Sequence, residues 1–214
     1  FVRIGADNTV TVIAKHLEMG QGSHTGLATL VAEELDAAWS QIRMEGAPAD
    51  LARYGNTLLA TQGTFGSTAM ANSFDQMRHA GATARALLVE AAAQRWQVPA
   101  DTLKVSQGVV RHPASGRSAR FGDLVAAAAQ LPAPAQVTLK EPKDFVYIGK
   151  RVNRTDSRSK IEGTAIFTQD VRLPGMLVAL VAHPPLFGAR VKSFDARRAR
   201  QVKGVEDVVA LTSG

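Results

Sequence analysis

The sequence predicts a mixed α+β protein in two parts, and three observations support this prediction. Short runs that alternate polar and apolar residues, such as Thr9-Val10-Thr11-Val12-Ile13, are typical of half-buried strands. An alanine-rich stretch from about residue 68 to 98 keeps its large apolar residues near one helical stripe. The Pro132-Ala133-Pro134 break then separates this region from a tail of different composition. We therefore expect two domains, 1–140 and 141–214.

The first half of the expected domain 1–140 combines strands with one helix. Ala6-Asp7-Asn8 supplies the turn of a hairpin, and residues 46–66 predict a loop because they are rich in Gly, Ala, Thr and Asn. Between these segments the apolar spacing predicts a helix and then a strand. The expected elements are strands at 2–4, 9–13 and 41–45 and a helix at about 25–36.

A long helix is the strongest predicted element. From about Thr68 to Val98 the many alanines favour a helix, and about 28 residues would make a rod of roughly 42 Å. Pro99 ends it, because proline cannot continue the helical hydrogen bonds. We expect a second hairpin at 103–105 and 109–111, and a short helix at 121–131.

The remaining residues are predicted to form a linker and a β-rich segment. Residues 135–150 have an extended, proline-containing composition. Runs of β-branched and other apolar residues predict three strands, and a basic stretch predicts a short helix. These elements are expected at 165–167, 177–181 and 208–211 for the strands and at 194–202 for the helix.

Composition excludes several classes of protein. The 214 residues contain no cysteine, which excludes disulfides, Cys-ligated zinc or iron–sulfur sites and a cysteine nucleophile within this chain. A hydrophobic content of 45% excludes wholesale disorder, and no apolar run approaches the roughly 20 residues of a membrane span. The net charge of +6 is local, because residues 1–140 hold 12 basic and 11 acidic side chains whereas residues 141–214 hold 13 and 8.

A first candidate site is the segment from Gly20 to Gly26, between a predicted strand and a predicted helix. Gly20 and Gly22 would let the backbone approach a ligand, and the next helix would offer unpaired N–H groups to an anion. The pattern differs from a dinucleotide-binding fingerprint, since the third glycine comes one residue late and no alternating βαβ series is visible. A plain tight turn is the alternative.

A second candidate is the segment 62–68, which leads into the long helix. Gly66, Ser67 and Thr68 could cradle a phosphate at the helix amino terminus. Alternatively, Ser67 or Thr68 acts only as a side-chain N-cap. Both glycine-rich segments precede helices, so two helix ends could converge on one polyanionic cofactor.

Other polar residues offer weaker candidates. The five histidines lack metal-ligand spacing, so no metal site is expected, and no nucleophile motif indicates catalytic residues. Glu33-Glu34 is expected to be a pair of solvated helix charges. The basic segment 190–203 could bind nucleic-acid phosphates, but it lacks the aromatic residues of a single-strand binder. We therefore expect no nucleic-acid partner, and instead a solvated helix face or a patch that meets an acidic neighbouring domain.

Several segments in the same order resemble one family. Residues 18–26, 30–36, 46–50, 66–68 and 78–85 resemble the molybdopterin-binding large subunit of the xanthine dehydrogenase and aldehyde oxidase family, in its isoquinoline 1-oxidoreductase β-subunit branch. Residues 148–150, 163–165 and 170–176 are similar to the opening of that family's a/b hammerhead domain. The resemblance thus implies part of a molybdopterin-binding domain, followed by the start of a hammerhead domain.

The resemblance also implies a function. Large subunits of this family hydroxylate an aldehyde or an N-heterocycle with water as the oxygen source, using molybdenum on a molybdopterin that is often a cytosine dinucleotide. Electrons leave through a small [2Fe–2S] partner subunit. By position, the cofactor contacts would be Gly20, Gln21, Gly22, Gly66, Ser67 and Thr68. An amide such as Gln21 can donate and accept together, which suits a pterin edge.

The chain also departs from this family. Phe65, Ala69 and Ala71 stand where many relatives have residues that favour phosphate contacts. The family's catalytic glutamate lies near the end of a much longer subunit, so both ends of this chain are expected to be cut and the fragment alone to be inactive. A non-catalytic scaffold of the same fold is the alternative. Relatives of this branch are often exported through a twin-arginine signal. The full-length protein is therefore expected to be periplasmic or membrane-associated if it is exported in this way, and cytoplasmic if it is not.

Overall fold

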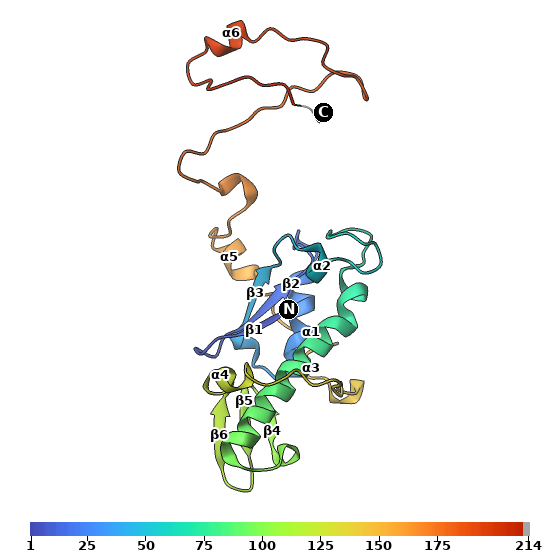
Figure 1. Ribbon diagram of the computed structural model, residues 1–214, viewed down its shortest axis with the longest axis vertical. Helices are drawn as coiled ribbons and strands as arrows, with labels where there is room; N and C mark the ends of the chain where they lie inside the picture. Colours follow the sequence, from blue (N-terminus) through green and yellow to red (C-terminus); the bar gives the residue numbers. More distant parts are fainter. Residues whose placement is uncertain (212–214) are drawn as a thin grey trace. The chain divides into compact units, whose positions relative to one another are not determined.

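The computed structural model describes residues 1–211 and divides the chain into two compact units, Phe1–Ala165 and Ile166–Gly214 (Figure 1). The expected domain boundary lay near residue 140. Residues 141–165 lie in the same compact unit as the first 140 residues. The division into a molybdopterin-binding domain and a hammerhead domain stays a prediction.

A three-stranded sheet forms one layer of the first unit. β1 (Val2–Ile4) pairs antiparallel with β2 (Val10–Ala14), and β2 pairs parallel with β3 (Ile42–Gly46). The helix α1 (Ser23–Leu35) connects the two parallel strands, so the chain contains one βαβ unit that the sequence did not reveal. Alternate residues of β2 are buried, as its period-2 pattern predicts.

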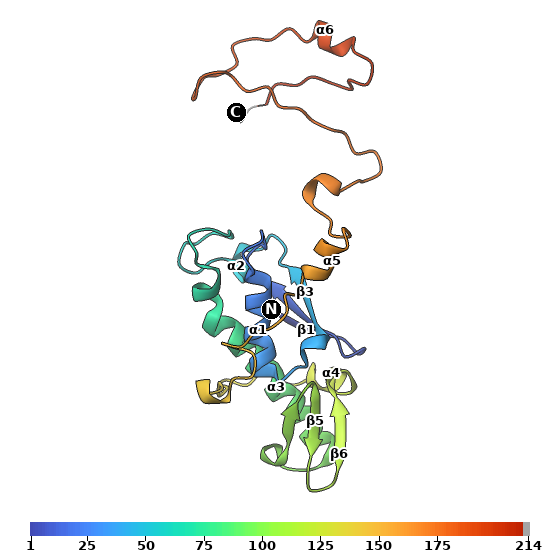
Figure 2. The same cartoon turned by 180° about the vertical axis from the view of Figure 1, so that it is seen from behind.

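Two helices pack closely beside this sheet. The long helix α3 (Ala69–Trp96) has 28 residues and confirms the strongest sequence prediction. It crosses α1 at Gly81, where a Cβ atom would lie 2.7 Å from the Val31 carbonyl oxygen. Glycine is needed there because the two backbones approach too closely for a side chain. Figures 1 and 2 show α3 running from the turns near α2 (Leu51–Tyr54) toward the second sheet.

The second sheet is an antiparallel meander at the carboxyl end of α3. It consists of β4 (Lys104–Ser106), β5 (Val109–His112) and β6 (Arg117–Arg120). The hairpin of β4 and β5 was predicted, whereas β6 was missed because only Ala119 of its four residues is buried. The helix expected at 121–131 is shorter, with a 3-10 turn at Phe121–Asp123 and α4 at Val125–Ala128.

The segment 135–150, predicted as a linker, is bound to α1 through buried charged side chains. Glu33 and Glu34 are both fully buried, so the expectation of two solvated charges is wrong. The Glu33 carboxylate accepts backbone N–H bonds from Val146, Tyr147 and Ile148 at 2.6–3.0 Å. The burial of this helix face therefore depends on a segment more than a hundred residues away.

Arg78 and Lys140 complete this network. Arg78 pairs with Glu34 at 2.7 Å, donates to the Lys140 carbonyl oxygen and lies over the rings of Phe74 and Phe145. The Lys140 ammonium pairs with Glu33 at 3.1 Å, and its backbone N–H donates to Glu34. Each buried charge thus has an opposite charge or several donors, which buried charges require.

The second unit, where it is described, contains little regular structure. Its elements up to residue 211 are a 3-10 turn at Thr168–Asp170 and the helix α6 (Arg197–Arg200), which is shorter than the helix expected at 194–202. The strands expected at 165–167, 177–181 and 208–211 do not form in the described chain. A strand needs a paired neighbour and a half-buried face, and Leu180 is 95% exposed. Within the described residues, no helix combines the length and the apolar character that crossing a bilayer requires.

Candidate cofactor-binding site

The first glycine-rich segment forms the turn between β2 and α1, at the carboxyl end of a parallel strand. Gly20 and Gly22 have φ angles of +105° and +89°, a region that favours glycine. Gly22 is the N-cap residue of α1 and provides no side-chain cap. The turn therefore leaves the first amide groups of α1 in need of an acceptor.

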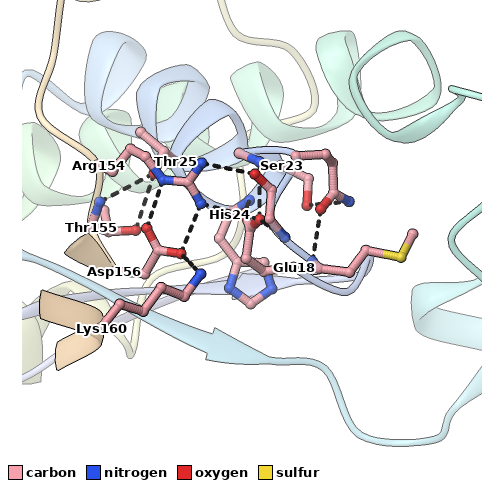
Figure 3. Close-up of polar contacts among 12 residues, drawn as sticks. Glu18, Ser23, His24, Thr25, Arg154, Thr155, Asp156 and Lys160 are labelled. Atoms are coloured by element: carbon pink, nitrogen blue, oxygen red, sulfur yellow. Dashed lines mark hydrogen bonds and ion pairs between the residues drawn. The ribbon is translucent and has the colours of Figure 1, made fainter. Parts of the chain in front are cut away.

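That acceptor is a carboxylate of the turn itself. Glu18 Oε1 accepts the N–H groups of Gly20 at 2.7 Å and Gly22 at 2.9 Å, and Oε2 accepts that of His24 at 3.1 Å (Figure 3). Burial acts to raise the pKa of Glu18, but the three backbone donors and the nearby Arg154 outweigh it and hold this pKa below its usual value. Two of the amides at the start of α1, those of Gly22 and His24, thus already have an acceptor.

Gln21 is also bonded within the turn. Its Oε1 accepts the Met19 N–H at 2.7 Å, and its Nε2 donates to the Leu17 carbonyl oxygen at 2.9 Å and to Ser23 Oγ at 3.2 Å. The residue as a whole is exposed. Because both ends of the amide are held, Gln21 has one fixed orientation at the surface of the turn.

Arg154 reaches the turn from a distant part of the first unit. Its Nη1 donates to the Gly20 carbonyl oxygen at 2.9 Å, and its Nη2 pairs with Glu18 at 3.3 Å. Asp156 pairs with Arg154 at 2.9 Å and also with Lys160, and these two cations hold the Asp156 pKa well below its usual range. Figure 3 shows this chain of charges beside the amino end of α1.

The second glycine-rich segment stands at the start of α3 and is more open. Gly66 and Ser67 are exposed and have φ angles of +63° and +55°. Thr68 occupies the N-cap position, but its hydroxyl donates to the Phe65 carbonyl oxygen and accepts from Asn56, so side-chain capping by Ser67 or Thr68 is not observed. A left-handed residue followed by a right-handed one, as at Ser67 and Thr68, is a backbone conformation that can turn successive N–H groups toward an anion. The Thr68 N–H also donates to the Phe65 carbonyl oxygen at 3.4 Å.

The structure brings the two segments together. The Leu17 N–H donates to Thr64 Oγ1 at 2.7 Å, and His16 Nδ1 lies 3.1 Å from the Gly63 carbonyl oxygen. In the first turn of α1, a Cβ on Gly26 would lie 2.6 Å from the Met70 sulfur of α3. The six predicted contact residues thus lie on two neighbouring turns, and their contact with a cofactor stays a prediction.

Two of the structurally important residues escaped the sequence analysis. These residues are Glu18 and Arg154. A glutamate two residues before the first of two turn glycines is a local signal for such a closed turn, whereas nothing local points to Arg154. Within residues 1–211, no cluster of three or more His, Cys, Asp or Glu side chains could hold a metal ion.

These features define a class of protein: an α+β domain with two glycine-rich turns at neighbouring helix starts. The match of the molybdopterin cofactor-binding domain family to residues 1–172 then shows that the chain belongs to this family. The chain is 38% identical to the isoquinoline 1-oxidoreductase β subunit of Brevundimonas diminuta, with 100% of this chain and 32% of that protein covered. These findings confirm the family resemblance recognised in the sequence.

Two further similarities complete the comparison. The chain is 32% identical to a membrane-bound aldehyde dehydrogenase (pyrroloquinoline-quinone) of Gluconacetobacter polyoxogenes, with 94% of this chain and 26% of that protein covered. It also resembles the crystal structure of quinoline 2-oxidoreductase from Pseudomonas putida 86, at 21% identity and a TM-score of 0.46, over 64% of this chain and 17% of that one. The chain thus spans about a third or less of the length of these relatives.

Proposed function

We propose that this chain is part of the large subunit of a molybdenum hydroxylase, which oxidises an aldehyde or an N-heterocycle. Family membership supports the cofactor, and the names of the two curated relatives, an isoquinoline oxidoreductase and an aldehyde dehydrogenase, support the two substrate classes. The observation that carries the proposal is the pairing of the two glycine-rich turns, tied together at Leu17 and Thr64. The 214-residue chain alone is inactive under this proposal.

The two turns would hold different parts of the cofactor. Gly66, Ser67 and Thr68 suit an anionic group, because Gly66 and Ser67 are exposed and α3 has no side-chain cap. The turn of Gly20, Gln21 and Gly22 suits the neutral pterin edge, because Glu18 already occupies its amides. When bound, the molybdenum would supply the two-electron acceptor for oxidation of the substrate carbon, with water as the source of oxygen.

The proposed partners follow from this assignment. Electrons would pass to a small [2Fe–2S] subunit, since this chain has no cysteine to ligate a cluster. The cofactor would be the cytosine dinucleotide form, whose second phosphate adds negative charge for the open turn at Gly66. The remainder of the large subunit would supply the catalytic acid–base residue and the substrate pocket.

Metal and pterin analysis of the purified large subunit tests the proposal. We expect one molybdenum and one cytosine nucleotide released per polypeptide, in a host that makes the cofactor. Gly66→Asp should lower the cofactor content by about tenfold or more, because a carboxylate would face the cofactor's phosphate. Gly116→Asp is the matched control, since Gly116 also has a positive φ, of +69°, and lies in open space away from both turns.

Two outcomes would count against the proposal. A wild-type subunit without molybdenum or pterin, produced beside a related enzyme that is loaded in the same cells, would favour the scaffold alternative. Equal cofactor content in Gly66→Asp, Gly116→Asp and wild type would remove the second turn from the binding site.

A further inference from the structure

At the amino end of α1, the carboxylate of Glu18 occupies the position that a bound anion would take. Three backbone N–H groups, of Gly20, Gly22 and His24, converge on the two oxygens of one carboxylate. The Glu18 side chain is only 8% exposed, so little water competes for these donors. A phosphate bound at a helix amino terminus would use the same kind of amide groups.

A cation completes the enclosure of this carboxylate. Arg154 pairs with Glu18 at 3.3 Å and also donates to the Gly20 carbonyl oxygen at 2.9 Å, so it contacts the turn at two residues. Asp156 holds the guanidinium through two hydrogen bonds of 2.9 Å. Next to it, the Thr155 N–H donates to Thr25 Oγ1 in the first turn of α1. Residues 154–156 are thereby fixed against the helix.

Gln21 is held within the same turn. The Gln21 backbone lies between the two glycines whose N–H groups Glu18 accepts. The Gln21 side chain then bonds to Leu17 and Met19, the two neighbours of Glu18. Without the carboxylate, a turn with two positive-φ glycines has many other conformations to adopt.

We propose that Glu18 is a positioning residue: its carboxylate is the resident anion of the α1 amino terminus, excludes a phosphate from it and holds the turn that presents Gln21. Arg154 ties this arrangement to the segment 154–156. The proposal rests on the proposed function in one respect, namely that the phosphate excluded here binds instead at Gly66–Thr68.

Amide exchange with formate rescue tests the resident anion directly. Hydrogen exchange of the full-length polypeptide, read by mass spectrometry in the peptide that contains residues 17–25, reports the three amides whether or not cofactor is bound. In Glu18→Ala this peptide should exchange about tenfold faster or more, since charge-assisted hydrogen bonds are lost. Sodium formate should restore the protection, whereas sodium chloride at equal ionic strength should not.

A matched variant separates this role from general loosening of the fold. Glu162 also pairs with an arginine, Arg158, at 2.9 Å, but it accepts no backbone bond from a glycine turn. Glu162→Ala should leave the exchange of residues 17–25 unchanged and show no response to formate. Unchanged exchange in Glu18→Ala would overturn the proposal, and so would faster exchange that formate does not reverse.

Cofactor retention then tests the link to the proposed function. A loaded Glu18→Ala subunit should lose molybdenum severalfold faster during gel filtration than wild type, and formate should slow the loss. Loss at the wild-type rate would overturn the positioning of Gln21 for the cofactor. A wild-type subunit without any cofactor would instead refute the proposed function, and the exchange experiment would still decide the role of Glu18.

Discussion

Replacing Glu33 by glutamine removes the charge from a fully buried carboxylate while nearly keeping its shape. In the native protein this carboxylate accepts three backbone N–H bonds from residues 146–148 and pairs with the Lys140 ammonium at 3.1 Å. A glutamine has one acceptor oxygen, and its NH₂ group would face either the Lys140 ammonium or the backbone donors. Some donors would therefore lose their acceptor inside the protein.

The expected loss of stability is about 3 kcal/mol. Removing one partner of a buried ion pair costs about 3–5 kcal/mol, because the other charge stays buried without compensation. The lower end applies here, since Lys140 keeps a second pairing with Asp36 at 2.6 Å. For a chain of this size, about 3 kcal/mol corresponds to a fall in Tm of about 6–12 °C.

Thermal unfolding followed by circular dichroism measures this change. Trp39 gives a local fluorescence signal as well, because its ring lies 5.7 Å from that of Tyr147, whose N–H donates to Glu33. Glu162→Gln is the control: it neutralises an exposed i,i+4 pair with Arg158 that contributes about 0.5 kcal/mol or less. Equal Tm values for Glu33→Gln and Glu162→Gln would refute the reasoning.

Three further predictions follow from the same packing. Burial acts to raise the pKa of Glu33, but the N–H groups of Tyr147, Ile148 and Val146 and the Lys140 ammonium outweigh it and lower this pKa. The Glu33 carboxylate therefore contributes its full stabilisation of the fold above about pH 4.5, and this contribution declines as the pH falls through the lowered pKa. Acid unfolding of Glu33→Gln, followed by circular dichroism, should lack this pH-dependent loss of stability. Gly81→Ala should destabilise by about 1–3 kcal/mol, measured in urea, because its Cβ would meet the Val31 carbonyl oxygen, and an unchanged urea midpoint would contradict the close crossing. Arg78→Lys should lower the free energy of unfolding by about 2 kcal/mol or more in the same assay. A lysine cannot lie over the rings of Phe74 and Phe145 and also bond to both Glu34 and the Lys140 carbonyl oxygen. The control Arg158→Lys, at an exposed position, should leave the free energy of unfolding almost unchanged.

The helices and strands with a clear local pattern could be predicted from the sequence. The alternation of β2 and the alanine-rich composition of α3 are properties of neighbouring residues, and both elements form nearly as expected. β6 was missed because its residues, Arg-Ser-Ala-Arg, carry almost no apolar pattern. That strand forms because β5 offers a paired edge, which is a property of the fold and not of the four residues.

In the candidate site, too, some features could be predicted from local sequence and others depend on the fold. Its two glycine-rich turns were located from the sequence, because glycines beside a predicted helix start are a local signal. The occupation of the first turn by Glu18 could not be predicted with them, since it depends on three amides that converge only when the turn has folded. Arg154 reaches this turn from more than 130 positions away.

The sequence by itself thus determined the family, the α+β composition, the long helix and the position of both glycine-rich turns. Only the tertiary structure decided which charges are buried: Glu33 and Glu34 read as surface residues, yet they hold the linker to α1. The physical reason is that a carboxylate is stable inside a protein only where donors surround it. Those donors come from Lys140 and residues 146–148, and only folding brings them to the helix.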